Sequence, residues 1–167
     1  MKAFKKIAVI GKYPSKEEST DINSQLLQLV EHLSKKPVEL FVEEKTQQQL
    51  NAQTIQAIAL KDIGACVDLA IIIGGDGTMI GVARNLVDSN TPLVGVNQGR
   101  FGFLADLNTS SMLTNIDSIL NGEYIEDKRM LINTKIIRDD HVVYESLSLN
   151  DIVIKSGVRL IELEVMI

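Results

Sequence analysis

The chain has 167 residues, close to the usual length of one domain, and its 45% hydrophobic and 23% charged residues are typical of globular proteins. A formal net charge of −5, with no basic cluster beyond Lys2, Lys5 and Lys6, argues against nucleic-acid binding. No apolar stretch approaches the ~20 residues of a membrane span. The single cysteine, Cys66, excludes an intrachain disulfide, fits a cytoplasmic location and is expected to be buried.

Short apolar runs alternate with stretches of helical spacing up to residue 123. The strand-like runs cover residues 5–12, 38–44, 67–73 and 92–97. The helical stretches cover residues 22–33, 79–87 and 110–122, and Gly122 is the expected stop of the last one. Residues 47–64 are weakly helical or form an ordered loop. This alternation predicts an α/β fold with an open, mostly parallel sheet and helices on both faces.

The pattern changes from Tyr124 onward, where the helical period disappears. Successive strands are expected there, with turns at Asp139–Asp140 and Lys155–Gly157. We therefore expect an α/β nucleotide-binding domain at residues 1–123 and the start of a β-rich, antiparallel domain at residues 124–167. A sheet this small is marginal alone, so we expect a fragment of a longer chain rather than a compact protein that ends on a strand.

A glycine-rich turn, Gly-Gly-Asp-Gly-Thr at residues 74–78, follows the third strand and precedes a helix. Ligands bind at this end of the strands in open parallel sheets, and a helix N-terminus suits phosphate. Gly74, Gly75 and Gly77 allow a nucleotide to approach the backbone, and Thr78 opens the helix. The spacing is neither that of a P-loop nor that of a Rossmann fingerprint.

Asp76, in the middle of this turn, is unexpected beside phosphate. Three roles are open for it: a helix N-cap, a ligand of a magnesium ion that bridges phosphates, or a general base that takes a proton from a substrate hydroxyl. The flanking glycines leave space for a substrate beside the carboxylate.

Two further clusters follow strands. In "GVNQGRFGFLADL", residues 95–107, Asn97 and Gly102 permit tight backbone, and Phe101 is either a packing anchor or part of a substrate wall. In "LNDIVI", residues 149–154, Asn150 and Asp151 interrupt an apolar strand. They form either a strand-end turn or contacts to a ligand, because buried polar groups need partners.

These clusters, in this order, resemble the NAD kinase family, and "GEYIEDKRMLI" resembles that family's linker into its second domain. The Gly-Gly-Asp-Gly-Thr motif is shared with lipid kinases and has a similar counterpart in phosphofructokinases, whereas Asn-x-Gly-x-x-Gly-Phe-Leu is similar to NAD kinases and not to the lipid kinases. The resemblance implies phosphoryl transfer from ATP, or from polyphosphate, to the 2′-hydroxyl of the adenosine ribose of NAD. It also implies a divalent metal, Mg²⁺ by expectation, and a homo-oligomer, dimer or tetramer, of the whole protein.

By this resemblance Asp76 is the proton acceptor, and Gly77 lies beside it at the dinucleotide. Asn97, Asn150 and Asp151 hold NAD, and Arg159 is a further contact or else a solvated hairpin arginine. Family members continue into a later Gly/Ser/Thr-rich segment that lines the site, so this chain by itself is expected to be inactive or impaired. Two alternatives stay open: a lipid or sugar-alcohol kinase of the same superfamily, and a non-catalytic dinucleotide-binding fragment.

Overall fold

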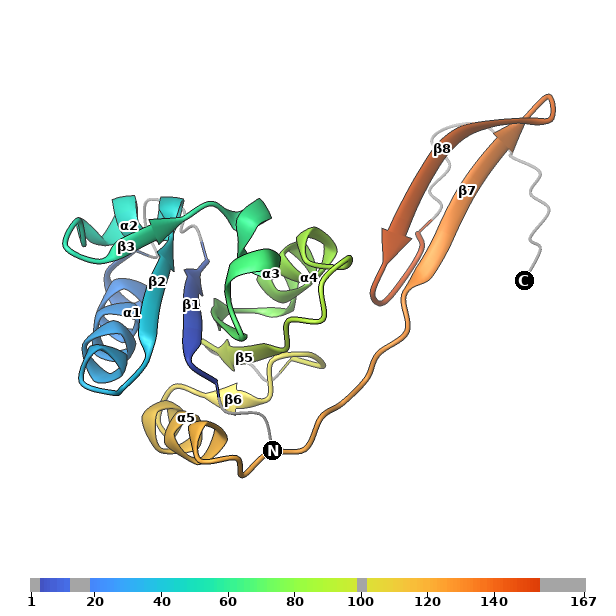
Figure 1. Ribbon diagram of the computed structural model, residues 1–167. Helices are drawn as coiled ribbons and strands as arrows, with labels where there is room; N and C mark the ends of the chain where they lie inside the picture. Colours follow the sequence, from blue (N-terminus) through green and yellow to red (C-terminus); the bar gives the residue numbers. More distant parts are fainter. Residues whose placement is uncertain (1–3, 13–18, 99–101, 154–167) are drawn as a thin grey trace. The chain divides into compact units, whose positions relative to one another are not determined.

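The computed structural model describes residues 4–12, 19–98 and 102–153, without the side chains of residues 19 and 20. It divides into two compact units, Met1–Asp127 and Lys128–Ile167. In the described part of the first unit, six parallel strands form one sheet in the order β3-β2-β1-β4-β5-β6 (Figure 1). They are β1 (Lys6–Gly11), β2 (Glu39–Glu43), β3 (Gln56–Ile58), β4 (Leu69–Gly74), β5 (Leu93–Asn97) and β6 (Leu107–Asn108).

Helices cover both faces of this sheet, as Figure 1 shows. They are α1 (Ser19–Ser34), α2 (Glu44–Leu50), the short 3-10 helix η1 (Leu60–Asp62), α3 (Ile63–Cys66), α4 (Asp76–Asn85) and α5 (Met112–Leu120). The expected fold class, an open parallel sheet between two helical layers, is confirmed.

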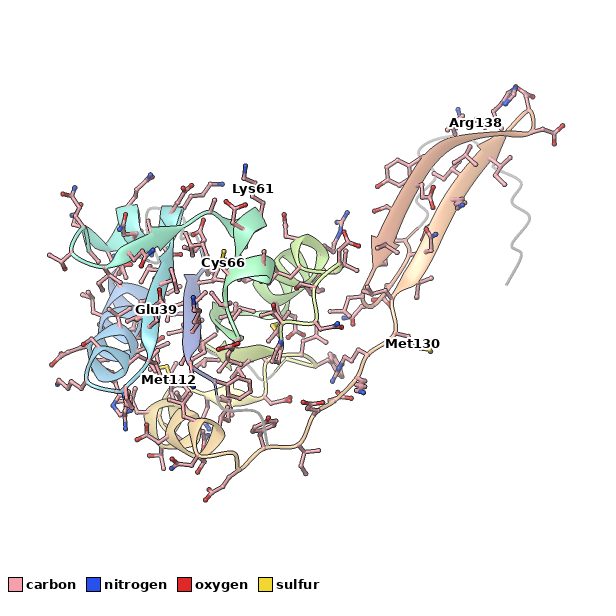
Figure 2. All side chains as sticks on the ribbon, in the orientation of Figure 1. Glu39, Lys61, Cys66, Met112, Met130 and Arg138 are labelled. Carbon is pink, nitrogen blue, oxygen red and sulfur yellow. The ribbon has the colours of Figure 1, made fainter. Side chains whose placement is uncertain are left out.

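Alternation along the strands builds two cores. Ile7 and Val9 of β1 face α1 and α5, whose side chains Leu26, Leu29 and Ile116 complete the first core. Met112 of α5 belongs to the same core, is 1% exposed and is labelled in Figure 2.

The opposite face of the sheet carries the second core. Ala8 and Ile10 of β1 pack there with Ile63 of α3 and with Val82 and Leu86 of α4. Successive side chains of a strand point to opposite faces, which is why a continuous apolar run such as residues 7–10 serves both helical layers.

The strand order places a switch point between β1 and β4. The chain runs outward from β1 through β2 to β3 and then returns to pair β4 with the other side of β1. The loops that leave the carboxyl ends of β1 and β4 therefore diverge, and such a point is the usual ligand site of an open α/β sheet.

The second unit contains an antiparallel hairpin of β7 (Ile132–Arg138) and β8 (His141–Ser148). Asp139 and Asp140 form its turn and have φ of 49° and 59°, the left-handed conformation that tight hairpin turns require. The expected turn at this position is confirmed, whereas Lys155–Gly157 lies outside the described residues.

The division falls a few residues after the expected boundary between residues 123 and 124. Tyr124 packs its ring on Phe4 at a centroid distance of 5.4 Å and adds to the first core, so it belongs to the first unit. Residues 47–64, expected to be weakly helical or an ordered loop, include the end of α2, the short strand β3, η1 and the start of α3 rather than one element.

Cys66 is exposed, which corrects the expectation that it is buried (Figure 2). The short helix α3 buries Ile63 against the sheet and turns its last residues outward. Within the described ranges, no helix has the length and hydropathy that crossing a bilayer requires.

Candidate active site

A hollow of about 640 Å³ lies at the switch point, where β1 and β4 end. Gly11 and Lys12, which leave β1, form one wall of it, and Gly75, Gly77 and Thr78, which follow β4, form another. Three of these five residues are glycines, so backbone is accessible on both walls, and the remaining lining residues are Ile10, Leu60, Gly81, Val82 and Asn85. The topology predicts a ligand site here, and the hollow supplies its space.

The glycine turn leads directly from β4 into α4. Gly75 is the N-cap of the helix, and its carbonyl accepts N–H groups from Thr78 and Met79 at 3.0 and 3.1 Å. A Cβ added to Gly75 or Gly77 would meet no atom within 4 Å, so these glycines border open space. Gly74 is different: a Cβ there would lie 2.6 Å from the Thr78 hydroxyl, so the close packing of Thr78 requires glycine.

Asp76 begins α4, and its carboxylate binds the loop that follows β5. Its Oδ2 accepts the backbone N–H of Phe103 at 2.8 Å, and its Oδ1 accepts that of Leu104 at 3.1 Å. The N-cap role for Asp76 is wrong, because Gly75 holds that position and Asp76 is the first residue of the helix. An ionised carboxylate offers about four acceptor positions, so two bonds leave room for a substrate hydroxyl.

Gly102 explains how the loop approaches this carboxylate so closely. A Cβ at residue 102 would lie 2.6 Å from Cγ of Asp76 and 2.7 Å from its Oδ2. Any other residue would displace the carboxylate or the loop. The second sequence cluster and the glycine turn thus form one structural unit, as expected for loops at the same edge of the sheet.

Asn97 is the last residue of β5 and pairs in register with Gly74, the last residue of β4. Its side chain is 8% exposed and is engaged within the protein. Next to it, Gln98 Nε2 donates to Gln25 Oε1 of α1 at 2.9 Å. The sequence prediction that the ends of the third and fourth expected strands lie side by side is confirmed.

The remaining predicted site residues lie in the second unit or outside the described residues. Asn150 and Asp151 belong to the second unit and are exposed. We expected these two residues to interrupt a strand, but they follow one. β8 ends at Ser148, which pairs with the first residue of β7, Ile132. Beyond that pair the hairpin offers no partner strand. Phe101 and Arg159 lie outside the described residues.

The sequence did not indicate that Gly11 and Lys12 line the site. The only signal for them is a glycine at the end of the first apolar run, followed by a lysine. Acidic and metal-binding side chains do not gather near them: the described residues contain no group of three or more His, Cys, Asp or Glu that could hold a metal ion. A metal at this site would have to be held mainly by a ligand's own phosphates and by water, as magnesium often is.

The chain is similar to known proteins along nearly all of its length. A model of the ATP-NAD kinase N-terminal domain matches residues 7–124. NAD kinases of Nitrosomonas eutropha and Aromatoleum aromaticum are 40% and 38% identical to it over 97% and 93% of this chain. The chain covers 54% and 51% of those two proteins, so it spans about half the length of the curated relatives it matches.

Two solved structures share the fold. A yeast NADH kinase complexed with NADH has a TM-score of 0.67 at 13% identity, covering 89% of this chain and 48% of that one. An NAD kinase from Archaeoglobus fulgidus in complex with ATP has a TM-score of 0.52 at 17% identity, covering 87% and 46%. At such identities the likeness concerns the fold alone.

Proposed function

Because this chain belongs to the NAD kinase family, we propose that the whole protein transfers a phosphoryl group from ATP, or from polyphosphate, to the 2′-hydroxyl of the adenosine ribose of NAD, forming NADP. The observation that carries this proposal is the position of Asp76. Its neighbours Gly75 and Gly77 line the hollow, while its carboxylate is turned to the loop at Gly102–Leu104. Asp76 itself does not line the hollow, and in this proposal its carboxylate stands between the hollow, which takes the donor, and this loop, beside which the acceptor binds.

The phosphate chain of the donor binds on the side of the hollow. Gly75 and Gly77 give it access to the first turn of α4, where unpaired N–H groups and the helix dipole favour anions. Lys12 also lines the hollow and adds a cation to it. A divalent cation, Mg²⁺ in our proposal, would be held by donor phosphates, water and at most Asp76, and would neutralise charge that develops during transfer.

The acceptor ribose binds on the side of Asn97 and the loop at residues 102–104. Asp76 takes the proton of the 2′-hydroxyl, the 2′-oxygen forms a bond to the γ-phosphorus, and the bond from that phosphorus to the bridging oxygen breaks to release ADP. Both Asp76 oxygens keep their backbone N–H bonds, which hold the carboxylate in place as the proton arrives.

The other proposed contacts to NAD rest on the family resemblance. We assign Phe101, Asn150, Asp151 and Arg159 to the dinucleotide, in addition to Asn97. We also expect the whole protein to be cytoplasmic and to assemble as a dimer or tetramer, and size-exclusion chromatography with light scattering would test the assembly.

Incubation of the whole protein with NAD, ATP and MgCl₂ tests the reaction, with NADP measured by an NADP-specific dehydrogenase. We expect NADP to form, and omission of either substrate or addition of EDTA to prevent it. Parallel assays with diacylglycerol and with sugar alcohols test the alternative acceptors. Phosphorylation of one of these without NADP formation would overturn the assignment of NAD, and tight NAD binding without any turnover would indicate a non-catalytic module.

A further inference from the structure

A buried carboxylate outside the proposed mechanism lies at the end of β2. Glu43 is 2% exposed and Thr46, three residues later in the first turn of α2, is fully buried. Glu43 Oε2 accepts two hydrogen bonds from Thr46, one from its backbone N–H and one from its hydroxyl, both at 2.9 Å. Burying a carboxylate is costly without such partners, so this pair calls for an explanation.

Helix capping alone does not explain the choice of glutamate. Glu43 is the N-cap of α2, a position where Ser, Thr, Asp and Asn are the favoured residues. The longer glutamate reaches the Thr46 hydroxyl as well as the Thr46 N–H. Its second hydrogen bond therefore sets the orientation of a hydroxyl group.

That hydroxyl has a second partner on β1. The backbone N–H of Gly11 donates to Thr46 Oγ1 at 3.0 Å. Because an N–H group can only donate, the Thr46 hydroxyl accepts the hydrogen bond from Gly11 and donates its own hydrogen bond to Glu43. Glu43 thus fixes the direction in which Thr46 offers a lone pair to Gly11.

The Gly11 N–H depends on the Thr46 side chain for an acceptor because β1 continues past its last pair with β2. The last pair between β1 and β2 is Val9 with Val42, while on the other side β1 continues along β4 to Gly11. The Thr46 hydroxyl takes the place of the missing strand carbonyl. A Cβ at Gly11 would lie 2.6 Å from Leu26 Cδ1 and 3.3 Å from Thr46 Cγ2, so the backbone is also held by close packing.

The segment held in this way is one wall of the hollow. Gly11 and Lys12 line it together with the glycine turn, and Lys12 N donates to Ile73 O of β4 at 2.8 Å. Thr46 secures the same segment from the β2 side. Loss of the Thr46 hydroxyl would leave the Gly11 N–H buried without its acceptor, and the wall would shift to recover one.

We propose that Thr46, oriented by Glu43, is a positioning residue that sets the affinity of the site for the phosphate chain of the donor. The proposal rests on the proposed function in one respect, namely that the donor phosphates bind in this hollow. Neither Glu43 nor Thr46 touches the hollow, so the effect is transmitted through Gly11 and Lys12.

The test compares Thr46→Val with Thr46→Ser in the whole protein, by steady-state kinetics and by calorimetry of ATP binding without NAD. Valine keeps the shape and removes the hydroxyl, and we expect the KM and the Kd for ATP to rise about tenfold, since a hydrogen bond to a buried group is lost. We expect the KM for NAD and kcat to stay within about twofold, and Thr46→Ser to restore ATP affinity.

A destabilised but distant variant separates positioning from general loss of stability. Ile116→Val removes a methylene from α5, which contributes no residue to the lining of the hollow, and should lower the melting temperature while leaving the KM for ATP unchanged. Unaltered ATP affinity in Thr46→Val, or equal rises in both KM values, would overturn the proposal. Because ATP binding is measured without NAD, this test remains valid even if NAD is not the acceptor. A wild-type protein that binds no ATP would refute the inference.

Discussion

Gly102 lies against the carboxylate of Asp76, although 26 positions separate them in the sequence, and a Cβ at residue 102 would come within 2.6 Å of Asp76 Cγ. The next two backbone N–H groups, of Phe103 and Leu104, bind the two carboxylate oxygens. The absence of a side chain at one residue thus allows the following two to hold the proposed catalytic base. Gly102 of the second cluster thus helps to fix the position of the Asp76 carboxylate.

Gly102→Ala should therefore impair catalysis severely. The added methyl group displaces Asp76 or the loop, and we expect kcat to fall by at least about tenfold, since small misplacements of a catalytic group are costly. The measurement is NADP formation by the whole protein. Gly64→Ala is the matched control: its Cβ would lie 2.7 Å from Ser89 Cβ, away from the site, so it should reduce stability and leave kcat unchanged. Equal kcat values for the two variants would contradict this account.

Gly122→Ala should destabilise the first unit by about 1–2 kcal/mol, the cost of a left-handed conformation for a residue with a side chain. Gly122 has φ of 90° directly after α5, and its N–H and that of Glu123 bond back to Ile119 O and Ser118 O. Urea unfolding measures the change. Asn121→Ala, at a neighbouring position with φ of −79°, should cost clearly less, and an equal loss in both variants would contradict the argument.

Asp117 should contribute a pH-dependent link between α5 and α1. Its Oδ1 is 2.8 Å from both His32 Nε2 and Lys36 Nζ. Burial by itself would raise the pKa of the Asp117 carboxyl, but the hydrogen bonds from Lys36 and His32 outweigh it and hold the pKa below its usual value. A lowered folded-state pKa gives stability that is present above the unfolded-state pKa and is lost as the pH falls through the folded-state pKa.

Asp117→Asn should accordingly lower the free energy of unfolding at pH 7 by less than about 1 kcal/mol, because the side chain is partly exposed and solvent weakens the interaction. The difference from wild type should shrink as the pH falls below about 4, where the carboxylate of the unfolded chain becomes protonated. Urea unfolding at several pH values measures it. The exposed Asp88 provides the control variant Asp88→Asn. A difference that stays constant down to pH 3 would contradict the assignment.

The sequence was sufficient where local pattern and chain order decide the structure. The apolar run at residues 67–73 and the glycines after it predicted β4 and its turn into α4, and Gly122 was predicted as the stop of α5. The position of the glycine turn beside the loop after β5 followed from a general rule, that the carboxyl ends of parallel strands share one edge of the sheet.

Interactions between distant residues were not predictable in this way. The bonds from Phe103 and Leu104 to Asp76, and from Gly11 to Thr46, depend on how loops of different strands meet in space. The three-residue strand β3 is too short for its alternation to register in the sequence. Asn150 lies beyond the strand because β7, the partner of β8, begins only at Ile132. No pattern around residue 150 indicates where that partner begins.

The kinetics of Asp76→Asn in the whole protein test the central claim most directly, because asparagine keeps the size of the side chain and one of its two acceptors for the loop N–H groups, and removes its basicity. We expect kcat for NADP formation to fall by at least about 10²-fold, with the KM for NAD within about threefold of wild type and Asp88→Asn unchanged. If the residue only held the loop, the KM for NAD would rise and kcat would be kept. Retention of most of the wild-type kcat would contradict the assignment of Asp76 as the base.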